Sequence, residues 1–272
     1  MQVLFVRHAE SLNNYLKSMA LDSGHARLRY PDPHLSETGY RQLAHVGPGI
    51  TRVLARRPSP ILRNPSSSGH RRRVHVAVSP MKRALLTAVP IVHSLQVPSD
   101  NHILTCVEIV PFLFEKGGCY SEVDGEGIRS SPGLTAREAM NLLPGSRIQD
   151  PSVMEDGWWK SPTRETQEEM EQRITRTLGW IRRIACTQVC DVLILVTHEG
   201  FSCACIRRFL KCEQTLLDWL YNASFSSLTL IPAHTSLPPP STTDGDIHEH
   251  REVHVILDYL NSVEHLPLEI LT

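Results

Sequence analysis

The sequence has no long apolar run, no excess of either charge and no paired cysteines. Its 272 residues contain 28 Lys and Arg against 29 Asp and Glu, a formal charge of −1 at pH 7. No overall field therefore favours a nucleic acid or an anionic membrane as partner. No segment approaches the roughly 18 consecutive apolar residues of a membrane span. We expect neither partner, and any attraction for an anion must be local.

The spacing of the cysteines and the position of the first predicted strand lead to two further expectations. Seven cysteines are scattered between Cys106 and Cys212, without the paired two-residue spacing of a zinc site. The first predicted strand begins at residue 2 or 3, which leaves no room for a secretion signal. We expect a cytoplasmic protein with reduced thiols, no metal and no cofactor. The sequence does not indicate its oligomeric state.

The most informative segment that is present ends the first apolar run. Residues 3–6 have the length of a strand and stop abruptly at Arg7-His8. Ligands bind at the carboxyl edge of open α/β sheets, and an imidazole beside an obligate cation at that edge is typical of phosphate handling. Two surface polar residues after a strand would give the same pattern, so this motif alone does not distinguish a phosphate site from an ordinary strand end.

Two later runs repeat the arrangement. Residues 191–198 are apolar up to Thr197-His198, and residues 74–79 end in Ser79 and are followed by Arg83. Further strands are predicted at 103–107, 226–231 and 252–260, and helices at 36–57, 80–95, from near 163, at 199–210 and, shorter, at 135–142. This alternation predicts an α/β fold, a three-layer α/β/α sandwich with a mostly parallel sheet, in a single domain over residues 1–272.

Local signals refine the helices. Gly47-Pro48-Gly49 is expected to interrupt the helix at 36–57, because proline removes a donor and clashes with the preceding turn. Thr135 with Glu138, and Thr166 with Glu169, are predicted to form capping boxes at the starts of two helices.

Five short motifs, in order along nearly the whole chain, carry a family resemblance. They are Arg7-His8-Ala9-Glu10-Ser11 with Asn14, Pro33 to Gly39, Ser79-Pro80 with Arg83, Leu195 to His198, and Asn261 to Leu266. Together they resemble the motifs of the histidine phosphatase superfamily, the phosphoglycerate mutase-like proteins. The chain departs from that pattern at Ala9 and Glu199, where glycine is commonest. The resemblance implies a phosphoglycerate mutase-like fold and a phosphohistidine intermediate at His8.

The chemistry explains why these residue types occur together. A phosphoryl group carries about two negative charges near neutral pH, and attack by a neutral imidazole requires those charges to be neutralised. Arg7 and Arg83 can each offer a fork of donors, and His198 adds a third cation if protonated. His8 is then free to attack, and the resemblance implies that a backbone carbonyl holds its other ring nitrogen. The resemblance also assigns Asn14 to substrate binding.

A leaving alkoxide needs a proton, and general acid catalysis supplies it. The resemblance implies that the acid lies in the loop after the strand at 103–107. Glu115, which precedes Gly117-Gly118, fits the family pattern. Glu108 is the alternative, and either could instead be an ordinary solvated carboxylate.

The predicted function is that of a metal-independent, histidine acid-type phosphatase, which hydrolyses a phosphomonoester of a small metabolite. Guanidinium and imidazolium groups would take the place that magnesium has in nucleotide-dependent phosphoryl transfer. A phosphoglycerate-type mutase is one alternative. A catalytically decayed, phosphate-binding regulatory protein is the other.

Substrate choice is assigned to two segments that are expected to form walls or a lid. They are residues 15–34, with Arg27, Arg29 and Tyr30, and residues 116–162, a predicted lid insertion. The adjacent Trp158 and Trp159 line a cleft or staple the lid to the core.

Two stretches lack the periodicity of a packed element. Residues 58–69 and 232–247 are rich in proline and small polar residues. We predict that both are flexible surface loops within the domain.

Overall fold

The computed structural model of the chain describes residues 1–23, 28–56, 71–123, 127–212, 219–233 and 252–272. Arg27, the predicted loop at 58–69 and most of the predicted loop at 232–247 lie outside the described residues.

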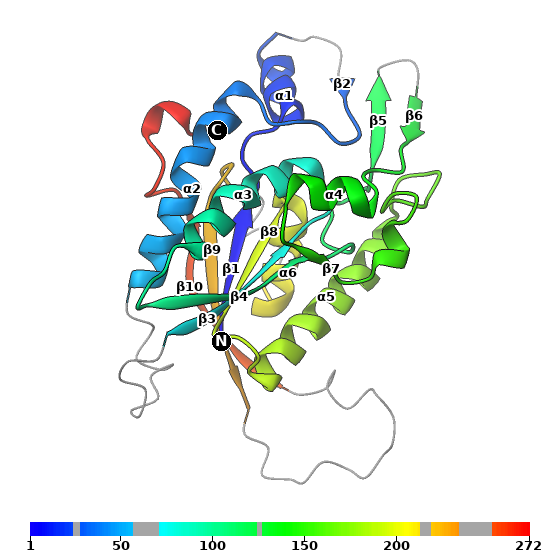
Figure 1. The fold of residues 1–272 in the computed structure, drawn as a ribbon. Coiled ribbons are helices and arrows are strands. Elements are labelled where there is room, and N and C mark those ends of the chain that lie inside the picture. Colours follow the sequence, from blue (N-terminus) through cyan, green and yellow to red (C-terminus); the bar gives the residue numbers. More distant parts are fainter. Residues whose placement is uncertain (24–27, 57–70, 124–126, 213–218, 234–251) are drawn as a thin grey trace, which may run out of the picture.

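A seven-stranded sheet of order β10-β9-β1-β8-β3-β4-β7 forms the centre of the fold (Figure 1). Its strands are β1 (Gln2–Arg7), β3 (Arg72–Val78), β4 (His102–Ile109), β7 (Arg147–Ile148), β8 (Val192–Thr197), β9 (Phe225–Pro232) and β10 (Val253–Ser262). β1 pairs in parallel with β8, β8 with β3, β3 with β4, and β4 with β7, whereas β9 is antiparallel to both neighbours. The predicted mostly parallel sheet is confirmed.

Helices cover both faces of this sheet. They are α1 (Leu12–Ser23), α2 (Glu37–Ala55), α3 (Lys82–Gln96), α4 (Ala136–Leu142), α5 (Gln167–Thr187) and α6 (Glu199–Leu210), with short 3-10 turns at Pro151–Met154 and Leu268–Ile270. Alternate side chains of β1 enter two separate cores. Leu4 and Val6 join the core with α2 and α3, whereas Val3 and Phe5 join the core with α5 and α6. The three-layer architecture follows from this alternation.

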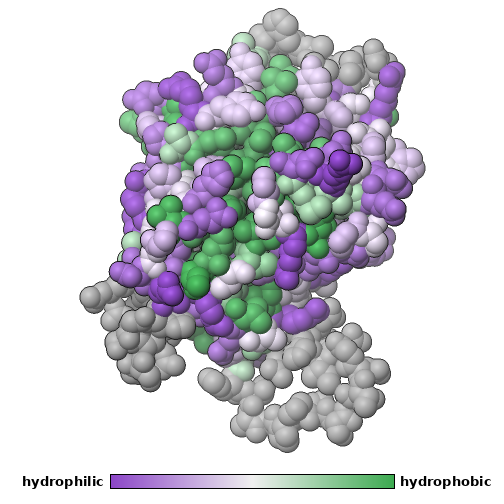
Figure 2. Space-filling model, in the orientation of Figure 1, coloured by the Kyte–Doolittle hydropathy of each residue, from purple (hydrophilic) through white to green (hydrophobic). Residues whose placement is uncertain are grey.

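In the orientation of Figure 1, hydrophobic residues gather along the middle of the visible face and hydrophilic residues surround them (Figure 2). No helix in the described part of the chain is long and apolar enough to cross a membrane. All seven cysteines are free thiols.

The expected interruption at Gly47-Pro48-Gly49 is wrong, because α2 runs through Pro48 without a break. The reason lies in the packing of α2 on α3. A Cβ at Gly47 would stand 2.3 Å from Ser94 Oγ and 2.5 Å from the Pro90 carbonyl oxygen, so the two helices are in backbone contact there. This contact supports the helix across the missing donor. Both predicted capping boxes are present.

A second, small sheet joins the two segments that were predicted to be walls. β2 (Leu28–Arg29) pairs with β5 (Tyr120–Val123), and β5 pairs with β6 (Gly127–Ser130), all antiparallel. Figure 1 shows this sheet beside α1, on the side toward which β1 points. We call these three strands the cap sheet.

Candidate active site

His8 follows the last residue of β1, and its ring is almost fully buried. Nδ1 lies 2.7 Å from the Ala9 carbonyl oxygen, and Nε2 accepts a hydrogen bond from Arg83 Nε at 3.0 Å. Burial, together with the charges of Arg83 and Arg7, holds the pKa of His8 well below its ordinary value. The ring is therefore neutral, and this network assigns the proton to Nδ1 and the lone pair to Nε2.

Arg83 lies in the first turn of α3, and a buried carboxylate stands beside it. Asp32 Oδ1 is 3.8 Å from Arg83 Nη1, and both Asp32 oxygens accept from the Lys82 amide at 3.0 and 3.1 Å. Burial raises the pKa of Asp32 to about 6, against the lowering effect of Arg83. Sequence reasoning missed Asp32, although it directly precedes the motif from Pro33 to Gly39.

Arg7 is held by one end of its guanidinium. Nη1 donates to the Leu220 carbonyl and forms an ion pair with Glu199 at 2.8 Å. Arg7 Nε is buried and has no hydrogen-bond partner among the described residues. Glu199, the departure from the family pattern at the start of α6, thus orients Arg7 and leaves the edge with Nε open for a ligand.

His198 faces the same centre from the end of β8. Its Nε2 lies 2.7 Å from Ser79 Oγ, and the centre of its ring is 5.1 Å from that of His8. Burial, followed by the charge of Arg83, holds the pKa of His198 well below its ordinary value. The ring is neutral in the absence of an anion, and its Nδ1 is buried without a partner among the described residues.

Backbone hydrogen bonds join the three strand ends. The His8 amide donates to the Thr197 carbonyl at 2.9 Å, and the Ser79 amide donates to the Val196 carbonyl at 3.0 Å. Residues separated by almost 200 positions therefore meet because adjacent parallel strands end at one edge of the sheet.

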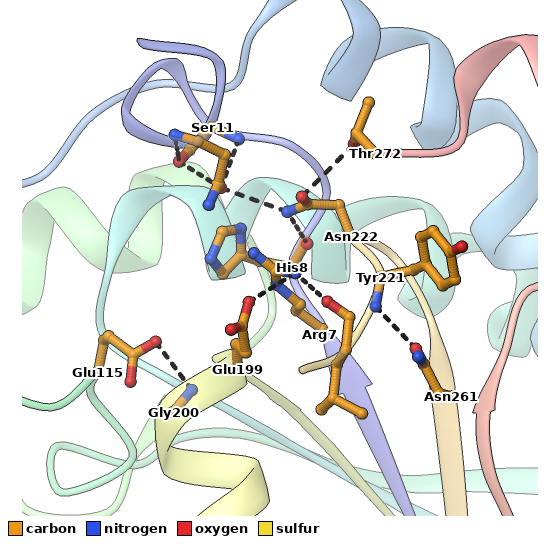
Figure 3. A network of polar contacts seen from close by, with 12 residues as sticks. Arg7, His8, Ser11, Glu115, Glu199, Gly200, Tyr221, Asn222, Asn261 and Thr272 are labelled. Atoms are coloured by element: carbon orange, nitrogen blue, oxygen red, sulfur yellow. Dashed lines mark hydrogen bonds and ion pairs between the residues drawn. The ribbon is translucent and has the colours of Figure 1, made fainter. Parts of the chain in front are cut away.

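Glu115 reaches the N-terminus of α6. Its carboxylate accepts from the amide of Gly200 at 3.2 Å (Figure 3). It also accepts from the amides of Phe201 at 3.1 Å and of its neighbour Lys116 at 2.8 Å. The charge of Glu115 also raises the pKa values of Arg7 and Arg83, although burial lowers both overall. Glu115 therefore caps the helix that follows His198 and acts electrostatically on both arginines.

Glu108, the alternative acid, has a different set of contacts. Its carboxylate lies 3.5 Å from His75 Nε2 and 3.0 Å from Arg147 Nε. In β3, Ala77 is the register partner of Glu108. His75 lies two residues before Ala77 and therefore on the same face of the strand. Ala77 belongs to the core beneath α5 and α6. Glu108 is thus bound within a buried pair of its own.

The loop that carries Glu115 is fixed by aromatic packing. Trp158 and Trp159 are buried, with ring centres 5.1 and 5.4 Å from that of Phe114. Gly118 has φ +81°, and a Cβ there would lie 2.4 Å from the Trp159 ring. The two tryptophans therefore attach the segment after residue 116 to the core.

Asn14 lies beside His8 within a chain of amide contacts. Its Oδ1 accepts from Ser11 Oγ at 2.7 Å and from Asn222 Nδ2 at 3.3 Å (Figure 3). Asn222 Nδ2 also lies 3.2 Å from the His8 carbonyl oxygen. Asn222 was not found from the sequence, because no strand end or motif marks it. Asn14 and Asn222 together fix the turn that follows His8.

The convergence defines a class of site. The neutral His8 ring, whose Nε2 accepts a hydrogen bond from Arg83 Nε, lies among three buried donor nitrogens that have no hydrogen-bond partner in the described ranges, which are Arg7 Nε, Arg83 Nη1 and His198 Nδ1. Such donors neutralise the oxygens of an anion that the imidazole can attack. No group of three or more His, Cys, Asp or Glu side chains in the described ranges is arranged to hold a metal ion. The arrangement is suited to phosphoryl binding and transfer.

Known proteins were compared with the chain. No protein-family model and no curated protein sequence match it. Solved structures do, among them a putative alpha-ribazole-5'-P phosphatase from Escherichia coli (18% identity, 96% of this chain and 97% of that chain, TM-score 0.47). Another is a phosphoserine phosphatase mutant from Entamoeba histolytica in complex with phosphoserine (16% identity, 98% and 99%, TM-score 0.48). A third is a mycobacterial glucosyl-3-phosphoglycerate phosphatase (19% identity, 96% and 98%, TM-score 0.47).

All three of these structural neighbours are named as phosphatases. With TM-scores below 0.5 and fewer than one identical residue in five, the likenesses do not by themselves assign an activity to this chain.

Proposed function

We propose that this chain is a phosphatase of the histidine phosphatase superfamily, which hydrolyses a phosphomonoester without a metal ion through a phosphohistidine at His8. The observation that carries the proposal is the state of the His8 ring. Its Nδ1 is held by the Ala9 carbonyl and its Nε2 lone pair faces the guanidinium of Arg83. An imidazole fixed in this tautomer can attack at Nε2 without first losing a proton.

In the proposed first step, His8 Nε2 attacks phosphorus while the bond to the leaving oxygen breaks. Arg7 and Arg83 bind the phosphoryl oxygens through Arg7 Nε and Arg83 Nη1, which have no hydrogen-bond partner among the described residues. His198, oriented by Ser79, donates a further hydrogen bond. A bound dianion would also raise the pKa of His198 toward its ordinary range, which strengthens His198 as a donor.

Glu115, in its protonated form, is the proposed proton donor to the leaving alkoxide, and it becomes a carboxylate in this step. In the second step, water attacks phosphorus while the P–N bond to His8 breaks, and the Glu115 carboxylate accepts a proton from that water, so that His8 is neutral and Glu115 is protonated again. The support for Glu115 over Glu108 is its place at the start of α6, next to His198, and its electrostatic effect on both arginines.

The test is hydrolysis of p-nitrophenyl phosphate in the presence of a chelator. We expect turnover by the wild type, and a loss of at least about a thousandfold in His8→Ala, because the nucleophile is removed. His93→Ala, an exposed histidine on α3, is the matched control and keeps wild-type activity. Rapid quenching should trap a phosphoenzyme that is labile in acid and stable in base, as expected for phosphohistidine.

Three results would overturn the proposal. Binding of vanadate without any turnover would indicate a phosphate-binding protein. Interconversion of monophosphoglycerates faster than their hydrolysis would indicate a mutase. Unchanged hydrolysis in His8→Ala would remove His8 as the nucleophile.

A further inference from the structure

A further cation, Arg29, belongs to the cap sheet. Arg29 on β2 stacks on the ring of Tyr120 on β5, with the guanidinium carbon 4.3 Å from the ring centre. Arg164 lies over the same ring at 4.5 Å. Tyr120 is buried, whereas Arg164 is exposed. Two guanidinium groups therefore share one aromatic ring at the edge of the candidate active site.

The donors of Arg29 are buried and unused. Nε and Nη2 are inaccessible to solvent and have no hydrogen-bond partner in the part of the chain that the structure describes. These two nitrogens form one edge of the guanidinium, the edge that binds a carboxylate or phosphate with two parallel hydrogen bonds. The stack on Tyr120 fixes the plane of this edge.

Arg29 differs from the two arginines of the candidate active site, each of which has a carboxylate counterion. Arg7 has Glu199 at 2.8 Å, and Arg83 has Asp32 at 3.8 Å. No ion pair to Arg29 occurs among the described residues. Burying the donors of a cation without a partner is costly. An anion that arrives with the substrate would remove that cost.

The position of Arg29 follows from its neighbour in sequence Asp32, whose Oδ1 lies 3.8 Å from Arg83 Nη1. Burial lowers the pKa of Arg83 to about 10, Asp32 opposes this, and the positive charge of Arg29 adds to the lowering. Arg29 and Asp32 also both act on the Cys119 thiol beside Tyr120. Arg29 thus lies on the Arg83 side of the pocket.

We propose that Arg29, held by Tyr120 and supported by Arg164, binds a second anionic group of the substrate. This assignment rests on the proposed phosphatase function and narrows it to phosphomonoesters with a carboxylate or a second phosphate near the scissile ester. The reacting phosphoryl group already meets donors from Arg7, Arg83 and His198, so a further guanidinium on the cap is surplus to a substrate with one anionic group.

The experiment compares substrates that differ in the second anionic group. The first pair is 3-phosphoglycerate and glycerol 3-phosphate, which differ in a carboxylate. The second pair is fructose 1,6-bisphosphate and fructose 6-phosphate, which differ in a phosphate. We expect kcat/KM to be at least about tenfold higher for the more anionic member of one pair, and the pair that responds identifies the group.

Variants then test the residue. Arg29→Gln should lower kcat/KM about tenfold more for the preferred substrate than for its less anionic partner, and Arg29→Lys should restore part of that preference. Arg164→Gln should have a smaller effect in the same direction. Arg137→Gln, which removes an exposed charge from α4, is the control and keeps the wild-type preference.

The outcomes separate this proposal from the proposed function. Absence of turnover of p-nitrophenyl phosphate by the wild type would defeat the phosphatase function itself. Turnover without preference in either pair would defeat only the second anionic subsite. An equal loss of kcat/KM for both members of a pair in Arg29→Gln would assign Arg29 to the scissile phosphate instead. If Arg29→Gln fails to fold, Arg29→Lys still tests the proposal, because it keeps the charge and removes the two parallel donors.

Discussion

Arg173 should be one of the largest single contributors to both stability and site geometry. It lies on α5, and its Nε and Nη2 donate to the two oxygens of Glu165, each at 2.6 Å. Its Nη1 donates to the carbonyls of Phe112 and Phe114 at 3.1 and 2.8 Å. The two side chains of the ion pair are 7% and 3% exposed. Arg173 therefore anchors, from the core, the loop that ends in Glu115.

The perturbation is Arg173→Met, which keeps most of the volume and removes the charge. Four hydrogen bonds are lost, and Glu165 remains buried with one partner, the Gly117 amide at 3.2 Å. Breaking a buried ion pair in this way costs about 3–5 kcal/mol. For a domain of this size each kcal/mol lowers Tm by about 2–4 °C, so we expect Tm to fall by about 6–20 °C.

The assay is urea denaturation of a double-mutant cycle. Glu165→Leu alone should also be destabilising, while the double variant should lose much less than the sum, with a coupling energy of about 1–3 kcal/mol. Arg176→Met, an exposed arginine on the same helix, is the control and should cost about 1 kcal/mol or less. A loss below about 1 kcal/mol in Arg173→Met, or additive effects in the cycle, would refute this account of the loop anchor.

Further predictions concern the acid, a buried carboxyl and the contact between α2 and α3. Glu115→Gln should lower kcat on an alkyl phosphate by about a hundredfold or more. The same variant should affect kcat on p-nitrophenyl phosphate far less, because nitrophenolate leaves without a proton. An equal loss of kcat on both substrates would leave Glu115 only as the cap of α6. Folding raises the pKa of Asp32 to about 6, so its contribution to stability is present below pH 3.8 and is lost as the pH rises through 6. Asp32→Asn should therefore gain up to about 3 kcal/mol relative to the wild type between pH 4 and 7 in urea denaturation, and a constant difference would contradict the shift. Gly47→Ala should lower the free energy of unfolding by about 1–3 kcal/mol, measured by thermal or urea unfolding. Pro48→Ala should be neutral or should raise this free energy by up to about 3 kcal/mol. A gain of stability in Gly47→Ala would refute the close contact between α2 and α3.

The strands were predicted well because each leaves a local signal. The apolar runs at 74–78 and 192–196 reappear within β3 and β8, and the antiparallel pair β9 and β10 lies where two late runs were predicted. The cap sheet was not predicted, because β2, β5 and β6 are only two to four residues long. β2 exists through its pairing with β5, as in the pair Leu28 and Val123, and no local pattern records a partner so distant in sequence.

The loop residues show the same contrast between a local sequence signal and contacts that only the fold creates. Glu115 was chosen by its spacing from glycine, and the spacing does not reveal that the carboxylate caps α6. Asp32, Asn222 and Arg29 gain their importance from neighbours that are distant in sequence. Their roles in substrate binding and turnover remain predictions for the experiments above.

The sequence by itself determined the central layer and the convergence of His8, Arg7, His198 and Arg83. Apolar runs that end in these residues become parallel strands and an adjoining helix, and the carboxyl ends of neighbouring parallel strands meet at one edge. Only the tertiary structure decided the continuity of α2, the partner of Arg7 and the cation of the cap, because each depends on atoms that are brought within contact distance by packing of separate elements.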